Sequence, residues 1–368
     1  MAGSSIGNIF RITTWGESHG KAVGVVVDGC PAGVNLTEED IQKYLNRRRP
    51  GQSKYTTGRS EADQVEILSG VFEGVTTGTP ISLMVCNQDQ HSKDYSNIAE
   101  TYRPGHADYT FWEKYGVRDY RGGGRSSGRE TIGRVAAGAV AAKVLEQLGV
   151  QFCTYATAIG PIRAERFDRD EISKNQLCMP DADAAKAAQV YLEECMASQD
   201  SAGGIIECKV MGMPVGIGDT VFEKLDGNLA KAMLSIGAVK GFEIGDGFAV
   251  AASKGSLNND AFLIDGEGNV CKKTNHSGGV LGGMSDGSDI VFRVAVKPTP
   301  SISQSQQTVN VQGEETQIEI HGRHDPIIVP RAIVVVEAMA AITLLDGVLM
   351  NMSARIDNIQ AFYNRKES

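Results

Sequence analysis

The sequence has little that would place it in a membrane, on nucleic acid or outside the cell. No uninterrupted apolar run approaches the roughly twenty residues that cross a bilayer. The first twenty residues, MAGSSIGNIFRITTWGESHG, carry neither a basic stretch nor a long apolar one, so no secretory signal is visible. The net charge of −9 argues against general affinity for nucleic acid or anionic lipid. Local basic clusters therefore need a local purpose, such as a small anionic ligand.

Cysteines are few and scattered. There are seven, an odd number, and no Cys-x-x-Cys pair occurs. This pattern is typical of reduced thiols in a cytoplasm and predicts neither a disulfide framework nor a zinc site. With 22% charged and 41% hydrophobic residues, the composition is that of a globular protein with a substantial core. No linker divides the chain, so we expect a single cytoplasmic domain over residues 1–368.

Helical and strand patterns are mixed without regular βαβ alternation, which predicts the α+β class. The predicted helices cover Glu38–Arg48, about Glu130–Leu148, Asp183–Ser198, roughly Asn228–Gly237 and the apolar stretch after Pro330. The predicted strands cover Ile9–Thr14, Val23–Asp28, Val65–Val71, Ile81–Asn87, Ile205–Val210 and Ile290–Val296. Two helices, at 130–148 and after Pro330, are apolar on nearly all sides, so we expect them inside the protein. The stretch Lys297–Thr316 is predicted to be a long loop.

The pentapeptide Gly16-Glu-Ser-His-Gly20 matches the nucleophile elbow of serine hydrolases. That motif needs a strand before its serine and a helix after it. Strand-like sequence lies on both sides here, so the helix is missing. Two interpretations stay open: a serine esterase that uses Ser18, and a turn between two strands that presents Ser18 and His19 to a ligand.

Two basic segments indicate an anion site. The stretch 47–59 has five positive charges and no acid, and the helix dipole accounts only for those on the helix end, before Pro50. The stretch 121–129, RGGGRSSGR, leads directly into a helix, where backbone N–H groups, hydroxyls and guanidinium groups can bind a polyanion. The runs Lys297–Ser301 and 322–326 offer further polar groups, but each run alone could equally consist of solvent-exposed residues with no binding role.

Taken in order, nine separated blocks resemble the chorismate synthase family. They are GESHG (16–20), RRRPGQSKYTTGR (47–59), DQVEILSGVFEG (63–74), RPGHAD (103–108), RGGGRSSGRET (121–131), SIGAVKGFEIGDGF (235–248), NHSGGVLGGMSDG (275–287), KPTPS (297–301) and GRHDPIIVPRA (322–332). The departures are small: Gly128 and Ile132 stand where the family usually has alanine, and Trp15 replaces a phenylalanine or tyrosine.

The resemblance implies an enzyme of the shikimate pathway, at the last common step of aromatic amino-acid biosynthesis. It would be a lyase that converts 5-enolpyruvylshikimate 3-phosphate to chorismate and phosphate by 1,4-elimination. Reduced FMN would be required without net redox change, and NADPH would act only indirectly through an external flavin reductant. The implied fold is a β-α-β sandwich with apolar helices between antiparallel sheets and an internal duplication. The implied assembly is a homotetramer.

The resemblance also implies residue roles. His106 would be a proton partner at the flavin, His19 the general acid for the departing phosphate, and Asp325 a helper in proton removal from flavin N5. Ser18 and Ser127 would orient the two histidines. The matched FMN positions are Arg125, Ser126, Ser127, Gly237, Ala238, Gly282, Lys297, Pro298, Thr299, Pro300, Ser301 and Arg323. The positions expected to bind substrate or NADP are Arg48, Arg49, Lys54 and Arg129.

Overall fold

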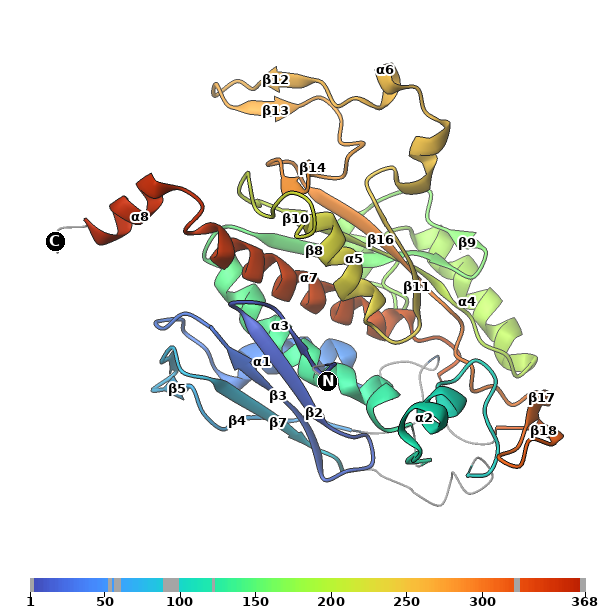
Figure 1. Ribbon diagram of the computed structural model, residues 1–368. Coiled ribbons are helices and arrows are strands. Elements are labelled where there is room, and N and C mark those ends of the chain that lie inside the picture. Colours follow the sequence, from blue (N-terminus) through green and yellow to red (C-terminus); the bar gives the residue numbers. More distant parts are fainter. Residues whose placement is uncertain are drawn as a thin grey trace.

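Two antiparallel sheets lie on either side of a layer of helices (Figure 1). The computed structural model describes residues 3–51, 55, 61–88, 99–120, 123–320 and 325–364. The long helices α3 (Thr131–Glu146) and α7 (Val329–Asn351) pack against each other, with α3 against the first sheet and α7 against the second. The predicted α+β sandwich, with apolar helices between antiparallel sheets, is confirmed.

The N-terminal half builds the first sheet, in the order β1-β2-β3-β7-β4. Its strands are β1 (Ser5–Ile6), β2 (Arg11–Gly16), β3 (Ala22–Asp28), β4 (Val65–Ile67) and β7 (Ile81–Cys86). Helix α1 (Glu38–Arg48) connects β3 to β4, and the hairpin of β5 (Val71–Phe72) and β6 (Val75–Thr76) connects β4 to β7. Thr37 and Asp40 form the predicted capping box at the start of α1, which satisfies backbone N–H groups there.

The C-terminal half builds the second sheet, in the order β11-β16-β10-β8-β9. Its strands are β8 (Gln151–Ile159), β9 (Ile162–Arg163), β10 (Gly204–Met211), β11 (Val239–Ile244) and β16 (Ile290–Val296). Helix α4 (Ala182–Ala197) precedes β10, and α5 (Leu225–Leu234) connects β10 to β11. The hairpin of β14 (Val280–Leu281) and β15 (Met284–Ser285) precedes β16.

The two halves repeat one topology. When the four main strands of each half are numbered in chain order, both β2-β3-β7-β4 and β8-β10-β16-β11 have the order 1-2-4-3. In each half a helix separates the second and third strands, and a long helix follows the fourth. The Thr76 hydroxyl donates to the carbonyl of Pro31 at 2.7 Å, and the Ser285 hydroxyl donates to that of Pro214 at 2.5 Å. Each hydroxyl also accepts a backbone N–H from the third residue after that proline. The expected internal duplication is present.

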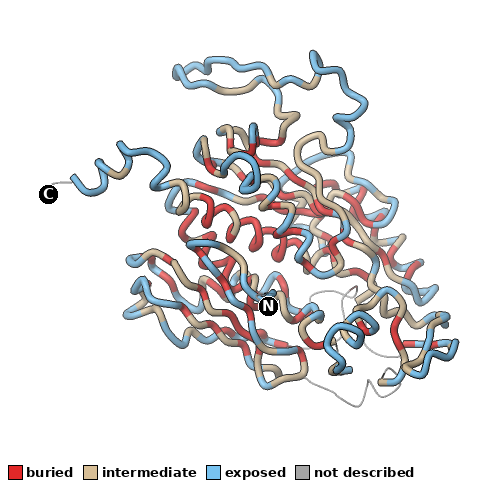
Figure 2. The backbone as a smooth tube through the Cα atoms, in the orientation of Figure 1, coloured by how far each residue is buried: buried red, intermediate tan, exposed pale blue. Residues whose placement is uncertain are grey.

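Small side chains let α3 and α7 approach closely where they cross. A Cβ placed on Gly138 would lie 2.3 Å from the Cβ of Ala338 and 2.5 Å from its Cα. Among the described residues, α7 is the one helix long and apolar enough to cross a membrane, but 78% of its most apolar window is buried in the protein (Figure 2). It is therefore placed as a core helix. Its buried Asp346 carboxylate accepts N–H groups from residues 8–10.

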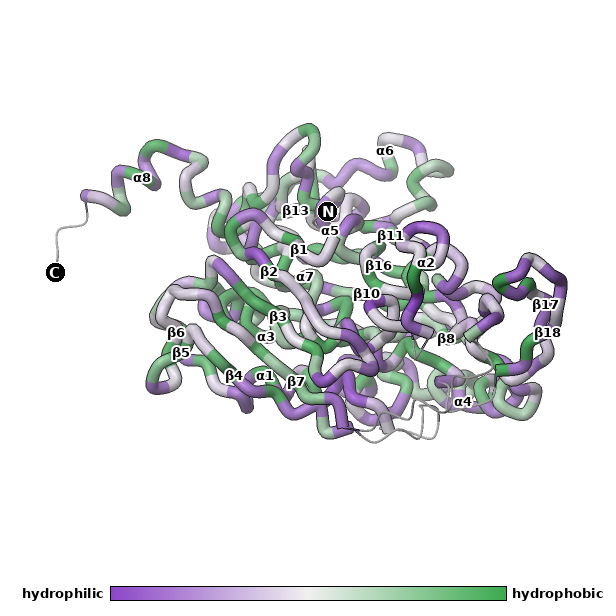
Figure 3. Tube along the Cα trace, turned by 60° about the horizontal axis from the view of Figure 1, so that its bottom comes forward, coloured by the Kyte–Doolittle hydropathy of each residue, from purple (hydrophilic) through white to green (hydrophobic). Residues whose placement is uncertain are grey.

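The remaining elements lie outside the two sheets. They are α2 (Asp108–Tyr115), α6 (Gly255–Asn258), β12 (Phe262–Ile264), β13 (Val270–Lys272), β17 (Gln306–Val309), β18 (Glu315–Ile318), α8 (Ile356–Tyr363) and the 3-10 turns η2 (Gly124–Ser126), η3 (Gly128–Glu130), η4 (Arg169–Ser173) and η5 (Gly247–Ala252). The β12–β13 hairpin and α8 project from the body and are largely exposed (Figures 1 and 2). Helix α8 carries both apolar and polar residues and ends on Ala361, Phe362 and Tyr363 (Figure 3).

Several local predictions match the structure, and others fail where pairing is non-local. Helix α1 and strand β16 have their predicted bounds. The prediction of an unbroken loop over Lys297–Thr316 is wrong, because β17 lies within it. The N–H of Tyr102 donates to the carbonyl of Val309 at 3.2 Å, so the β17–β18 hairpin binds a segment about two hundred residues earlier. Such a partner leaves no local periodicity to detect.

Candidate functional site

The turn Gly16–Gly20 connects β2 directly to β3. The predicted turn between strands is confirmed, and the helix that an elbow requires is absent here; the expected outward presentation of Ser18 is not seen, because Ser18 is 2% exposed. Ser18 is buried, and its Oγ lies 3.1 Å from Nδ1 of His19. Because the serine does not sit on a strand-to-helix elbow, the geometry does not favour the esterase alternative.

Asn87, directly after β7, ties this turn to a buried arginine. Its Nδ2 donates to the carbonyls of Glu17 and Gly20, at 3.0 and 2.8 Å. Its Oδ1 accepts from Nε of Arg129 at 2.8 Å. One amide thus links the Ser18–His19 turn to the start of α3.

The described part of the 121–129 segment folds into two tight turns against β2. The Arg125 guanidinium donates to the carbonyl of Gly16 at 3.1 Å and to the Thr14 hydroxyl at 2.6 Å. Ser126 donates to the carbonyl of Gly123, and Ser127 accepts the N–H of Arg129 as the cap of η3. Arg125, matched to an FMN position, therefore also stabilises the Ser18–His19 turn.

A buried carboxylate orients His106. Oδ1 of Asp108 lies 3.0 Å from Nδ1 of His106 and accepts from Nη2 of Arg103 at 2.8 Å. Arg118 lies 3.3 Å from the other carboxylate oxygen. Burial alone would raise the pKa of Asp108, but hydrogen bonds from Arg103 and His106 lower it well below its ordinary range. On its other side the imidazole borders Gly123, where a Cβ would lie 3.4 Å from Nε2.

The Lys297–Ser301 run packs beside the His106 loop. Nζ of Lys297 donates to the carbonyl of Gly105 at 2.9 Å, and the N–H of Lys297 donates to the carbonyl of Ala238. The Ser201 hydroxyl donates to the carbonyl of Thr299 at 2.7 Å. The next residue in the chain, at 202, donates its N–H to the carbonyl of Pro326. Four sequence blocks therefore converge here: 103–108, 237–238, 297–301 and the segment after 324.

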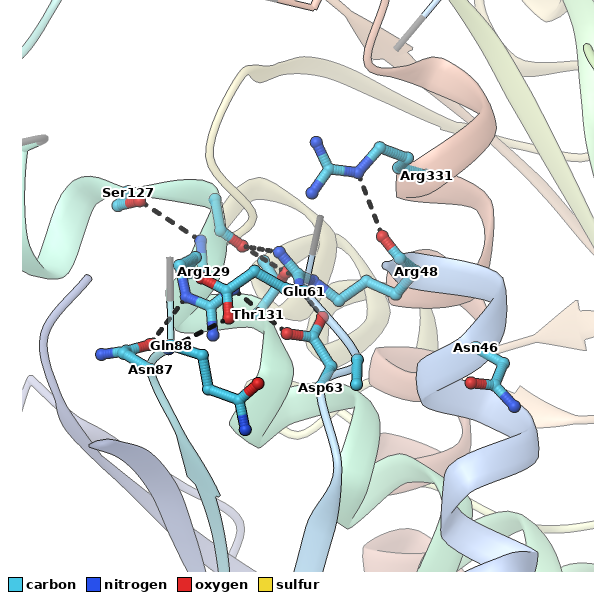
Figure 4. Close-up of polar contacts among 12 residues, drawn as sticks. Asn46, Arg48, Glu61, Asp63, Asn87, Gln88, Ser127, Arg129, Thr131 and Arg331 are labelled. Carbon is cyan, nitrogen blue, oxygen red and sulfur yellow. Dashed lines mark hydrogen bonds and ion pairs between the residues drawn. The ribbon is translucent and has the colours of Figure 1, made fainter. Parts of the chain in front are cut away.

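Two nearly buried arginines share one carboxylate (Figure 4). Asp63 accepts from Nη1 of Arg48 through Oδ2 at 2.8 Å and from Nη1 of Arg129 through Oδ1 at 3.1 Å. The Glu61 carboxylate lies 3.5 Å from the same Arg129 nitrogen. Arg48 also donates to Thr131 and to the carbonyl of residue 128. The cluster joins the end of α1, the segment before β4 and the start of α3.

Asp325 is connected to this cluster through Arg331 on α7. Nη1 of Arg331 lies 2.6 Å from Oδ2 of Asp325, and its Nε donates to the carbonyl of Arg48 at 3.0 Å. Burial, with Arg331 and Arg129 nearby, lowers the pKa of Arg48 to about 9. Burial and the neighbouring Lys240 likewise lower the pKa of Lys297. In each of the two places a neighbouring positive group adds to the effect of burial, and an anionic ligand would relieve it.

Comparison with known proteins identifies the family. The family model of chorismate synthase matches residues 10–349. A chorismate synthase of Agathobacter rectalis is 66% identical over 367 residues, covering 99% of this chain and 100% of that protein. One of Chloroflexus aurantiacus is 53% identical over 356 residues, covering 97% and 98%. A crystal structure of chorismate synthase matches at 30% identity with a TM-score of 0.75, covering 98% of this chain and 97% of that one.

The chain belongs to the chorismate synthase family. It is an enzyme, and the activity of its family is that of a carbon–oxygen lyase acting on a phosphate.

Not every position expected from the chorismate synthase resemblance lies at this end of the fold. Gly282 sits in the turn between β14 and β15, before the start of β16, whereas Lys297 follows its end, roughly 20 Å away along the strand. The role of Gly282 stays a prediction, as do the roles of all the other matched positions, including Gly237 and the exposed Arg49. Lys54 and Arg323 lie outside the described residues.

Four residues of this chorismate synthase family member emerge only from the structure: Asp63, Asn87, Asp108 and Arg331. Three lie inside or beside blocks that resemble the family, but a sequence shows no partner for an isolated carboxylate or guanidinium. The signal that could have identified the two acids is charge balance. Each buried basic group needs a nearby carboxylate, and Asp63 and Asp108 lie within five residues of Arg59 and Arg103 in the sequence, although Glu61 is nearer still to Arg59.

Proposed function

We propose that the protein catalyses the anti-1,4-elimination of phosphate from 5-enolpyruvylshikimate 3-phosphate, giving chorismate. The reaction would depend on reduced FMN without net redox change and would be the last common step of the shikimate pathway. The observation that carries the proposal is the convergence of the resembling blocks through direct contacts at one end of the fold. High identity to named chorismate synthases supports it.

The charges of the site suit this substrate. The substrate has two carboxylates and a phosphate, and FMN adds a second phosphate, so four anionic groups must be held. Arg48, Arg129, Arg331, Lys297 and Arg125 bring five cations to the same end of the fold. Guanidinium groups bind carboxylates and phosphates through paired hydrogen bonds, which gives geometric as well as electrostatic selection.

The residues matched to FMN fit such a ligand. The Thr299 hydroxyl is buried and has no hydrogen-bond partner among the described residues. A Cβ on Gly237 would meet no heavy atom within 4 Å, which leaves open space beside Ala238. Thr299, Ser301 and Lys297 would hold the flavin through hydroxyl and ammonium donors, and Ser126, whose hydroxyl donates to the carbonyl of Gly123, would accept a hydrogen bond. When bound, reduced FMN supplies the electron density that lets phosphate depart without an external oxidant.

The side chains would then move protons. His19, oriented by Ser18 through Nδ1, would protonate the departing phosphate. His106, held at Nδ1 by Asp108, would exchange a proton through Nε2 at the flavin. Asp325, held at Oδ2 by Arg331, would accept a proton at Oδ1. Ser127, the cap of η3, would keep the segment beside His106 in place.

The test is phosphate release under anaerobic conditions. We expect chorismate and phosphate in equal amounts with chemically reduced FMN, and neither with oxidised FMN. Equal turnover without any flavin would contradict the proposal. NADPH is proposed to act only through an external reductant in the cytoplasm. NADPH with oxidised FMN should therefore support turnover only after a flavin reductase is added.

Thr299→Val tests FMN binding independently of turnover. Removing a buried hydroxyl that has no partner should not destabilise the ligand-free protein, whereas losing a hydrogen bond to FMN should weaken binding by roughly 2- to 12-fold. Thr343→Val is the matched control, because that hydroxyl donates within α7 at 2.8 Å. It should leave the dissociation constant of FMN unchanged. Wild-type FMN affinity in Thr299→Val would remove this hydroxyl from the binding site.

We also propose a homotetramer. The supporting observation is exposed apolar surface on the two projecting elements: Phe262 and Ile264 on β12, Val270 on β13, and Phe362 on α8. An isolated two-stranded hairpin is barely stable in water, so this one needs a covering surface. Light scattering should give a mass near four chains of 39.3 kDa, and a monomer at micromolar concentration would contradict the proposal.

A further inference from the structure

The Asp63 cluster contains a positive group whose hydrogen-bonding capacity is incompletely used. Arg129 is 4% exposed, and its Nε and Nη1 donate to Asn87 and Asp63. Its Nη2 is buried and has no partner among the described residues. A buried donor without a partner lowers the free energy of unfolding, by about as much as a hydrogen bond to a charged group would raise it. Such an atom is expected where a ligand supplies the acceptor.

Asp63 fixes the direction in which that nitrogen points. Each of its two oxygens accepts from a different arginine, so the guanidinium groups of Arg48 and Arg129 are held on either side of one carboxylate (Figure 4). Asn87 holds the opposite edge of Arg129 through Nε. With Nε and Nη1 both fixed, rotation of the planar guanidinium is blocked and Nη2 has one orientation.

The backbone of Asp63 is itself held in an unusual conformation. Its φ is +47°, in the left-handed region that costs a residue other than glycine free energy unless the surroundings enforce it. Gln42 on α1 provides that support. Its Nε2 donates to the carbonyl of Asp63 at 3.2 Å, and its Oε1 accepts the N–H of Val65 at 3.1 Å. Helix α1 thus supplies both Arg48 and the side chain that places the partner of Arg48.

We propose that Asp63 is a positioning residue for substrate: it aligns Arg48 and Arg129 so that Nη2 of Arg129 binds an anionic group, phosphate or carboxylate, of the enolpyruvyl substrate. The inference rests on the proposed function and assigns to this acid a role in it. Asp63 does not touch the substrate. Glu61, which lies 3.5 Å from the same guanidinium, is a second carboxylate beside Arg129 among the described residues.

Asp63→Asn is the decisive variant, because it keeps the shape and removes the charge and one strong acceptor. We expect the dissociation constant of 5-enolpyruvylshikimate 3-phosphate, measured by calorimetry, to rise about 10- to 100-fold, while that of FMN changes less than about threefold. KM should rise more than kcat falls. Shikimate 3-phosphate, which lacks the enolpyruvyl carboxylate, separates the two anionic groups. If its affinity falls equally, Nη2 binds the phosphate or ring carboxylate; otherwise it binds the enolpyruvyl carboxylate.

Glu337→Gln is the matched control. Glu337 is a buried carboxylate on α7 that pairs with Arg47, the neighbour of Arg48 on α1, at 2.7 and 2.9 Å. Its loss also breaks an arginine–carboxylate pair at the end of α1, but Arg47 is 43% exposed, so stability should fall by less than in Asp63→Asn. We expect no change in the dissociation constant of the substrate. If both variants lose stability and both bind substrate as the wild type does, Asp63 is structural only and the inference is wrong.

Two further variants keep the inference testable. In an Arg129→Lys background, which lacks Nη2, Asp63→Asn should weaken substrate binding little further, whereas additive effects would contradict the coupling.

If Asp63→Asn does not fold, Gln42→Met removes the support of Asp63 and should raise the dissociation constant of the substrate about threefold or more. Wild-type affinity in that variant would overturn the inference. A wild-type protein that forms no chorismate with reduced FMN would instead contradict the proposed function.

Discussion

Replacing Gly138 with alanine tests the helix crossing on which the two-sheet architecture depends. The added Cβ would lie 2.3 Å from the Cβ of Ala338 and 2.5 Å from its Cα, whereas carbon atoms normally approach to about 3.5–4.0 Å. The helices would have to separate by more than about 1 Å. Both are buried against a sheet on their other side, so separation strains packing in both halves.

Two opposing terms set the magnitude of this effect. Overpacking a close-packed core typically costs about 1–3 kcal/mol, and a contact with backbone atoms belongs at the upper end. Replacing glycine with alanine inside a helix raises stability by about 1 kcal/mol, because alanine has the higher helix propensity. We therefore expect Gly138→Ala to lower the free energy of unfolding by about 2 kcal/mol.

Urea unfolding followed by far-UV circular dichroism, at fixed protein concentration, measures this change. Gly128→Ala is the matched control, because a Cβ there would meet no heavy atom within 4 Å. It should raise stability by up to about 1 kcal/mol. If Gly138→Ala were as stable as the wild type while Gly128→Ala behaved as expected, the close approach of α3 and α7 would be refuted.

Three further outcomes are expected. Asp325→Asn should lower single-turnover rates by roughly 10²–10⁴-fold with little change in substrate or FMN binding, and near-normal turnover would show that Asp325 only pairs with Arg331. Arg125→Ala should weaken FMN binding by about 1.5–3 kcal/mol in calorimetry, and unchanged affinity would remove it from the site. Asp108→Asn should cost about 3 kcal/mol at neutral pH, since it breaks a buried ion pair. Because the folded pKa of Asp108 is depressed, this deficit should be constant above about pH 4 and shrink as the pH falls further; a deficit equally large at pH 3 would contradict the assignment.

Local sequence pattern was sufficient where an element carries its own signals. Thr37 and Asp40 mark the start of α1 by a capping box, and the apolar surface of α3 and α7 predicts burial between layers. Local pattern was insufficient where an element contacts a segment that lies far away in the chain. Helix α2, strand β8 and the β17–β18 hairpin were not predicted, and β17 is fixed by the segment at 101–102. The prediction of a single domain stays a prediction.

The candidate site divides in the same way. Motif resemblance supplied residues that are proposed to bind a ligand, such as His106 and Lys297, because their blocks are distinctive. It did not supply Asp63 or Asp108, whose function is to hold other side chains. A buried carboxylate between two arginines is recognised only when three segments are seen together. The sequence analysis therefore missed those residues whose role depends on the side chain that they contact in the fold.

The internal duplication explains why the resembling blocks converge at one place. In each half the fourth strand, β7 or β16, is followed by a long connection and then by the central helix, α3 or α7. The first connection carries His106, Arg125 and Arg129, and the second carries Lys297–Ser301 and Asp325. Helices α3 and α7 cross near their middles, and the connections that lead into their N-termini lie on the same side of the molecule. There, the ammonium group of Lys297 donates a hydrogen bond to the carbonyl of Gly105. The duplicated halves thus supply one scaffold, and their two equivalent connections, which differ in sequence, supply one asymmetric candidate site.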